Sequence, residues 1–352
     1  MPRTKSPRRA LIVNLALVAV AFGLLGLVVW KNGDEIRKVF SKPVDSRFFA
    51  LGFGIYLSAL LITFARWHRL VRAQGLTFSL RDALRLGFIG NVFNLVIPGA
   101  VGGDVIKAAF LCRMQPDRKP QAVASMVLDR ILGLLGLFLL AGAAGLMTWR
   151  SASPDVRVLI GLVWGALASG FAALAVVFSP SLYRPLNRLV AGRGRLEVLV
   201  RELESIGLAY RERLGTVAAM LGVSVLGHTL YVLAFYSASL ALFERMPTLV
   251  QHYLMVPLAL FTTAVPLPFG ALGLSEQISG QLFGMVHHAD GAIAMMAFRI
   301  LMYASGAFSA CVYLANLKQV QALSRNAGEV VEAAVGASIA TTAVVATGEA
   351  AG

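Results

Sequence analysis

Four charged residues lie inside apolar segments near the middle of this chain. They are Asp104 and Lys107 in one apolar run and Asp129 and Arg130 in the next. A lysine offers a point charge to an anion, and an arginine offers a planar fork that binds a phosphate through two hydrogen bonds. The two carboxylates could balance these cations or exchange protons. This combination predicts an anion site, for which a phosphate group is a suitable ligand.

The run that contains Asp104 is interrupted just before that residue. Pro98 lacks a backbone donor, and Gly99 permits the chain to reverse. Gly102 and Gly103 let another backbone or a ligand come close. The helix that starts after this break would direct its free N–H groups and its positive dipole end toward the membrane interior. We therefore expect the break itself to contribute to anion binding.

Two asparagines precede the break, and they allow two interpretations. Asn91 and Asn94 lie on one face of the helix that leads to it, so they could satisfy freed backbone groups or contact a lipid headgroup. The charged residues are also open to a structural interpretation. Asp104 and Lys107 are three residues apart on a helix and could simply pair with each other. We favour a binding role, because ionisable residues within membranes usually mark pathways or binding sites.

A second interrupted run repeats the features of the first. Pro268 and Gly270 break it, and Gly273 and Glu276 follow. Arg299 lies 31 residues after the proline, and the corresponding spacing in the first run is 32 residues. Interrupted segments at matching positions in two halves predict an inverted-repeat transporter with its site near the middle of the membrane. We expect Glu276 to balance charge or couple to protons, and Arg299 to serve an outer gate.

The composition indicates the class of protein. Of 352 residues, 57% are hydrophobic and 14% are charged, and the mean hydropathy is +0.73, which is typical of an all-α, polytopic membrane protein. The net charge of +14 belongs mainly to loops, as expected for loops near anionic lipid headgroups. No nucleic-acid motif is visible. The two cysteines are far apart and no residues have metal-ligand spacing, so we expect no metal and no cofactor.

Six apolar runs reach or approach the length needed to cross a bilayer, which takes about 20 residues of helix. They are Leu11–Trp30, Phe48–Ala65, Gln121–Trp149, Val156–Phe178, Leu214–Phe243 and Gly291–Leu317. The two interrupted runs, 83–112 and 253–286, consist of halves too short to span comfortably. Basic residues flank the first and few positive charges flank the second, so we expect re-entrant helical hairpins that enter from opposite faces. The alternative is eight full spans.

The remaining segments frame one transmembrane domain over residues 11–320. The basic leader, 1–10, predicts a cytoplasmic N-terminus, and the expected location is the inner membrane of a bacterium. The polar, arginine-rich connection 179–213 is expected to form a surface helix on the cytoplasmic side. The tail, 321–352, lacks a core partner and is expected to be loosely held or disordered. Glycine-rich helix faces would permit a homo-oligomer.

The residues around the first break form part of a longer pattern. It comprises Asn91, Asn94, Pro98, Gly99, Gly102, Gly103, Asp104, Lys107 and Ala108, and then Ala122, Ser125, Asp129, Arg130, Gly133 and Leu134. This pattern resembles that of the lysylphosphatidylglycerol synthase transmembrane region, also called the flippase-like or UPF0104 family. Ala65-Arg66-Trp67 is similar to an earlier element of the family. The segment from Pro268 to Glu276 is similar to a late element, from which Ala271-Leu272 departs.

The resemblance implies a membrane domain that translocates lipids, best known for aminoacylated phosphatidylglycerol. The full synthase carries a soluble aminoacyl-transferase domain after its membrane part, whereas residues 318–352 follow the last predicted span here. We therefore expect no enzyme activity. The expected partners are a membrane lipid of phospholipid, glycolipid or hopanoid type and an enzyme of lipid biosynthesis. No nucleic acid is expected.

The sequence favours a flippase-like translocator of a lipid with a polar or phosphate-bearing headgroup. Arg130, Lys107 and the start of the second half-helix would hold the headgroup while the tails remain in the bilayer. One alternative is an intramembrane lipid or polyprenyl-phosphate transferase that uses Asp104 or Asp129 as its base. Another is a scaffold that holds a lipid-biosynthesis complex through the connection 179–213.

Overall fold

A computed structural model of the chain describes residues 22–23, 25–27, 29–31, 33–41, 44–96, 102–179, 181, 188, 204, 207–264 and 271–315. These residues form helices joined by short turns, which confirms the predicted all-α class. The α-helices are α2 (Gly33–Phe40), α3 (Ser46–Ala73), α4 (Leu80–Val96), α5 (Gly102–Met114), α6 (Lys119–Thr148), α7 (Pro154–Phe178), α10 (Leu214–Leu240), α11 (Leu249–Phe261), α13 (Leu274–Gly284) and α14 (Gly291–Ala315).

Five helical segments among the described residues are long and apolar enough to cross a membrane. They are Ser46–Ala73, Pro116–Thr148, Pro154–Phe178, Gly207–Leu240 and Gly291–Ala315. They correspond to five of the six predicted spans, so the chain is a multi-pass membrane protein. The sixth predicted span, Leu11–Trp30, lies largely outside the described residues, as do the leader, most of the connection 179–213 and the tail.

Local sequence signals explain where several helices begin. Ser153 precedes α7, and its hydroxyl accepts a hydrogen bond from the backbone N–H of Val156 at 3.4 Å. At the start of α11, the Thr248 hydroxyl accepts from the backbone N–H of Gln251, and the Gln251 side chain accepts from the backbone N–H of Thr248. These caps satisfy backbone donors that have no partner within the helix.

Two pairs of short helices occupy the predicted hairpins. α4 and α5 have 17 and 13 residues, α11 and α13 have 13 and 11, and the two members of each pair pack against each other. At about 1.5 Å per residue, no helix of the four reaches the roughly 30 Å of a bilayer core. The Gln115 side chain after α5 donates to the carbonyl of Thr77 before α4 at 2.7 Å. The start of α4 and the end of α5 are therefore held side by side. Re-entrance into the membrane stays a prediction.

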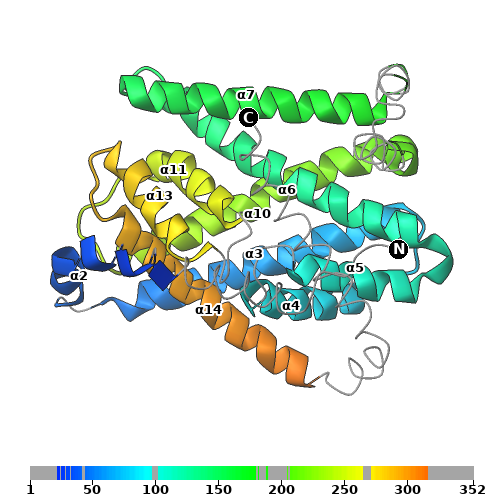
Figure 1. Cartoon of the computed structure of the whole chain (residues 1–352), viewed down its shortest axis with the longest axis horizontal. Coiled ribbons are helices and arrows are strands. Elements are labelled where there is room, and N and C mark those ends of the chain that lie inside the picture. Colours follow the sequence, from blue (N-terminus) through cyan, green and yellow to red (C-terminus); the bar gives the residue numbers. More distant parts are fainter. Residues whose placement is uncertain are drawn as a thin grey trace, which may run out of the picture.

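The long helices hold these two pairs apart. α3 packs along α10 through the middle of the bundle, α5 and α11 pack on α6, and α4 and α13 pack on α14. Figure 1 shows α4 and α5 at one end of the molecule and α11 and α13 at the other. α7 packs on α6 at the outer edge, where a Cβ on Gly145 would lie 2.8 Å from Ile160, so close helix contact needs glycine there.

Candidate functional site

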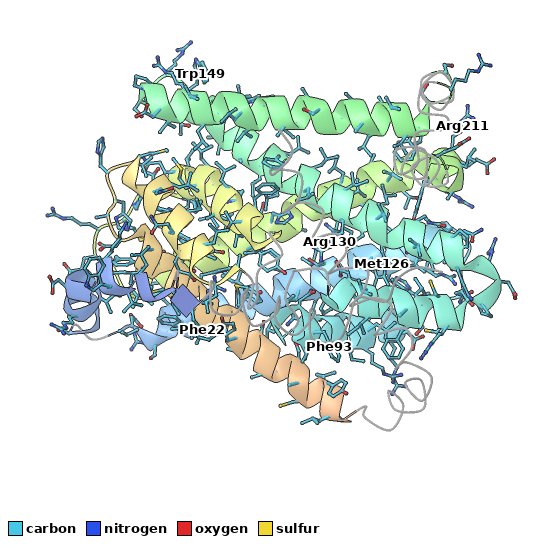
Figure 2. All side chains as sticks on the ribbon, viewed as in Figure 1. Phe22, Phe93, Met126, Arg130, Trp149 and Arg211 are labelled. Atoms are coloured by element: carbon cyan, nitrogen blue, oxygen red, sulfur yellow. The ribbon has the colours of Figure 1, made fainter. Side chains whose placement is uncertain are left out.

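A cavity of about 290 Å³ opens among the helices in the interior of the bundle. Its walls come from α3, α4, α5, α6, α10, α11 and α14 and the turn after α11. The residues that line it are Tyr56, Leu60, Thr63, Phe64, Arg66, Gly87, Asn91, Asn94, Asp104, Lys107, Asp129, Arg130, Gly133, Leu134, Leu137, His228, Tyr231, Leu260, Phe261, Thr263, Phe298 and Met302. The four charged residues singled out in the sequence therefore share one cavity. Figure 2 labels one of them, Arg130, on α6 near the centre of the molecule.

The Asp104 carboxylate forms ion pairs with two cations. Its carboxylate accepts from the Lys107 ammonium at 2.6 Å through one oxygen and from the Arg130 guanidinium through the other. Asp104 lies in the first turn of α5, where a carboxylate complements the positive end of the helix. The side chains of Asp104 and Lys107 are 12% and 10% exposed, whereas that of Arg130 is 45% exposed. Arg130 is thus the more accessible of the two cations.

Lys107 is held by more than its carboxylate partner. Its ammonium lies 5.2 Å from the centre of the Trp67 ring, which stabilises the positive charge. Its methylene groups run along Gly90, where a Cβ would come within 3.0 Å of them. This packing lets the charged end reach the cavity while the stem stays in apolar surroundings.

Asp129 pairs with a residue whose role the sequence did not reveal. Arg66 on α3 donates from Nε to Oδ1 of Asp129 at 2.8 Å and from Nη2 to Oδ2 at 3.0 Å, with a further bond to the Asp129 carbonyl at 3.1 Å. It also donates to the Ser224 hydroxyl on α10. Both charged side chains are more than nine-tenths buried. This bidentate pair joins α3 to α6, and the bond to Ser224 adds α10, at residues that line the cavity.

The two asparagines have structural partners. The Asn94 side chain accepts from the backbone N–H of Gly103 at 2.8 Å and so satisfies a donor at the start of α5, the turn that Gly102 begins. Asn91 donates to the Ser309 hydroxyl at 3.0 Å and ties α4 to α14. Both also line the cavity. Pro98 and Gly99 lie outside the described residues.

The second predicted cluster is sealed within the protein. Glu276 is fully buried, and its carboxylate accepts from the Arg299 guanidinium and from the backbone N–H of Gly273 at 2.7 Å. Gly273 has a φ of 83°, which favours glycine. None of these three residues lines the cavity. Pro268 and Gly270 lie outside the described residues, and the roles expected for Glu276 and Arg299 stay predictions.

Three further polar residues of the cavity were missed in the sequence. Thr63, His228 and Tyr231 lie singly in the long helices α3 and α10. His228 bonds through Nε2 to the Gly133 carbonyl on α6 at 2.9 Å. A lone polar residue in an apolar helix has no spacing pattern that distinguishes it from a packing residue, so only the fold could reveal this group.

Comparison with known proteins gives two results. The family described as the lysylphosphatidylglycerol synthase TM region matches residues 11–309. A UPF0104 membrane protein from Methanothermobacter thermautotrophicus is 26% identical over 207 residues, which cover 58% of this chain and 56% of that protein. A UPF0104 membrane protein from Pyrococcus horikoshii is 26% identical over 121 residues, which cover 34% of this chain and 36% of that protein. The matched part of this chain thus spans about half or less of the length of these relatives.

Proposed function

The chain belongs to the family of the lysylphosphatidylglycerol synthase TM region, and from this premise we propose that it translocates a membrane lipid with a polar or phosphate-bearing headgroup. The observation that carries the proposal is the cavity, which brings Arg66, Lys107 and Arg130 together with Asp104 and Asp129 inside a bundle of apolar helices. Among the described residues that line it, three cations face two carboxylates. Such a cavity suits an anionic group that enters from the lipid.

Arg130 and Lys107 are the proposed headgroup ligands. Both already hold Asp104, and Arg130 is also partly exposed to the cavity. A phosphate that approaches Arg130 would replace one ionic partner by another, so the guanidinium never becomes an unpaired charge in apolar surroundings. The lipid tails remain in the bilayer while the headgroup crosses.

We propose that the two halves of the chain form an inverted repeat, on which the transport cycle depends. Helix starts in the second half follow those of the first by 168 to 172 residues, from 46 to 214 for α3 and α10 and from 119 to 291 for α6 and α14. The contacts correspond too, because α4 packs on α14 as α11 packs on α6, and α5 packs on α6 as α13 packs on α14. α3 and α10 run in opposite directions in Figure 1. This pattern supports hairpins that enter from opposite faces, with the cavity between the halves.

We place the protein in the inner membrane of a bacterium with its N-terminus in the cytoplasm, in accord with its basic leader. No covalent step is assigned to the cavity, because the two carboxylates that line it are both held in ion pairs. An enzyme of lipid biosynthesis would supply the cargo.

Transport in proteoliposomes tests the proposal. Purified protein would be reconstituted with acyl-chain-labelled phospholipids, and the movement of label between leaflets would be followed with a quencher that does not cross the bilayer. We expect Arg130→Ala to slow the movement of phospholipids by about 10- to 100-fold, since a charge-assisted hydrogen bond is lost. Arg157→Ala serves as the matched control, because Arg157 is an exposed arginine on α7 that does not line the cavity.

Two results would argue against translocation. One is Arg130→Ala transporting at the rate of the parent chain. The other is a chemically altered lipid in the reaction mixture, which mass spectrometry would detect and which would favour the transferase instead.

A further inference from the structure

We propose that the contact of α11 with α10 and α13 is sensitive to protons. The contact stays closed while the ring of His252 is neutral, and it opens when that ring takes up a proton. Acid would then move α11, whose far end forms part of the cavity wall. The inference goes beyond the proposed function, because it holds for any cargo.

The His252 ring lies among three aromatic rings from two other helices. His252 is only 1% exposed and lies near the start of α11. The centre of its ring is 4.9 Å from that of Tyr236 and 6.1 Å from that of Phe235, both on α10. The Phe283 ring on α13 is 5.2 Å away. One side chain of α11 is thus packed between α10 and α13.

The hydrogen bond of His252 fixes the protonation of its ring in this packed arrangement. Nδ1 lies 3.0 Å from the carbonyl oxygen of Thr248, which can only accept, so Nδ1 carries the proton. Nε2 is buried and has no hydrogen-bond partner among the described residues. A second proton on Nε2 would place both a charge and an unsatisfied N–H within an apolar contact. The closed contact therefore accepts only the neutral ring.

A second imidazole lies on the other side of the Phe283 ring contact. His288 belongs to the turn between α13 and α14, and its ring centre is 6.0 Å from that of Phe283. Burial lowers the pKa of His288, and the nearby Asp290 offsets part of this effect. Of the charges that act on His252, that of His288 has the strongest effect, and it disfavours a positive charge on the His252 ring.

The remaining titratable or charged groups at this end of the bundle lie on the same helices and turns. They are Tyr236 on α10, Glu244 and Arg245 in the turn before α11, Tyr253 on α11, and His287 in the turn after α13. The Tyr236 ring is the one of these that packs directly against the His252 ring. It brings no negative charge that would stabilise an imidazolium.

These contacts determine the direction of the pH dependence. A histidine whose charged form is disfavoured in the closed contact stabilises that contact fully above its ordinary pKa of about 6.5. The stabilisation is lost as the pH falls below that value, because the ring of the open form reaches water and takes up a proton. Uptake of one proton between about pH 7.5 and about pH 5.5 multiplies the population of the open form by about 10.

The movement of α11 would reach the cavity. The helix starts beside the His252 contact, and Leu260 and Phe261 near its other end line the cavity. The Phe261 ring also packs on that of Phe138 on α6, with the ring centres 5.2 Å apart. Displacement of α11 therefore changes both the wall of the cavity and its contact with α6. Acid on the side of the membrane where α11 begins would control this change.

Hydrogen exchange followed by mass spectrometry tests the inference. The purified full chain in detergent micelles would be compared at about pH 7.5 and about pH 5.5, with rates corrected for the direct effect of pH on exchange. We expect the protection of α11 and α13 to fall about 10-fold in acid, and that of α3 to stay constant. His252→Gln should remove this dependence, because its amide can donate to the Thr248 carbonyl but cannot become charged. His287→Gln is the matched control at an exposed neighbouring position and should keep the dependence.

The parent chain allows a second measurement if His252→Gln does not fold. Nuclear magnetic resonance of the chain labelled with ¹⁵N-histidine distinguishes the two neutral forms of the ring and the charged form. We expect one ring to remain neutral with its proton on Nδ1 at about pH 5.5, where exposed histidines are charged. A charged His252 ring in the closed chain would overturn the inference.

The exchange experiment has several results that would contradict the inference. They are equal protection of α11 at the two pH values, greater protection in acid, an equal loss of protection in α3, and an intact pH dependence in folded His252→Gln. None of these results bears on lipid transport. The proposed function is tested separately by Arg130→Ala in proteoliposomes.

Discussion

Asp129 and Arg130 are neighbours in the chain but have different partners. Consecutive side chains on a helix diverge by about 100°, so Asp129 turns toward Arg66 on α3 while Arg130 turns toward Asp104 on α5. The first pair is sealed and fully hydrogen-bonded, and the second is partly exposed to the cavity. One dipeptide therefore contributes both a fixed anchor between helices and a cation available to a ligand.

The sealed pair makes a testable prediction about stability. Asp129→Asn leaves the Arg66 guanidinium buried without its counter-charge, and we expect it to lower the free energy of unfolding by about 3–5 kcal/mol. Thermal unfolding in detergent micelles measures the change. Asp155→Asn, at an exposed position in the first turn of α7, is the control and should cost no more than about 0.3–1 kcal/mol, the contribution of an exposed carboxylate at a helix start.

A double variant checks the cause of that loss. Arg66→Met combined with Asp129→Leu removes both charges and should recover a large part of the stability. A double variant that is no more stable than Asp129→Asn would show that lost packing, rather than an unpaired charge, accounts for the effect.

At the scale of the helix, the contact between α4 and α5 depends on glycine. A Cβ on Gly103 would collide with the Gly90 carbonyl, so the two backbones touch directly. The same contact lets Asn94 reach the Gly103 N–H and places Lys107 beside Gly90. The approach of the two backbones thus sets the position of the charged group in the cavity.

Gly103→Ala is predicted to separate these helices. Because the obstacle is backbone rather than a movable side chain, we expect a loss of about 1–3 kcal/mol in stability together with slower lipid transport. Gly54→Ala is the matched control, since nothing lies within 4 Å of a Cβ there and alanine favours a helix. Equal thermal stability of Gly103→Ala and Gly54→Ala would refute a close backbone contact.

At the scale of the whole molecule, features set by residues close together in the sequence could be predicted, whereas contacts between distant helices could not. Asp104, Lys107 and Arg130, which line the cavity, could be singled out from the sequence because charges close to a break in an apolar segment are conspicuous. The pairing of Arg66 with Asp129 and the place of His228 in the cavity were not predicted, since each residue reaches α6 across more than 60 residues of chain. Helices α4 and α11 begin at Leu80 and Leu249, three and four residues before the predicted starts at 83 and 253. The prediction was late because the residues that cap a helix lie outside its apolar run.

The inverted arrangement predicts the side of the membrane on which the chain enters and leaves each hairpin. In a chain with Cys112→Ala and Cys311→Ala, Asp117→Cys marks the end of the α4–α5 pair and Ala289→Cys marks that of the α11–α13 pair; both positions are exposed. We expect a membrane-impermeant maleimide to label Ala289→Cys in intact cells and Asp117→Cys only after permeabilisation. Labelling of both from one side would rule out the inverted repeat.

The excess positive charge of the cavity also has an electrical consequence. The described residues that line the cavity are three cations and two carboxylates, and in the proposed cycle one monoanionic phosphodiester would offset the difference of one charge. In an alternating cycle, the transmembrane voltage then acts on the empty protein and hardly on the loaded one, with about 2.3 kcal/mol per 100 mV for a charge that crosses the whole field. Each lipid carried would transfer one elementary charge, so the resting potential would favour one direction of transport without any other energy source.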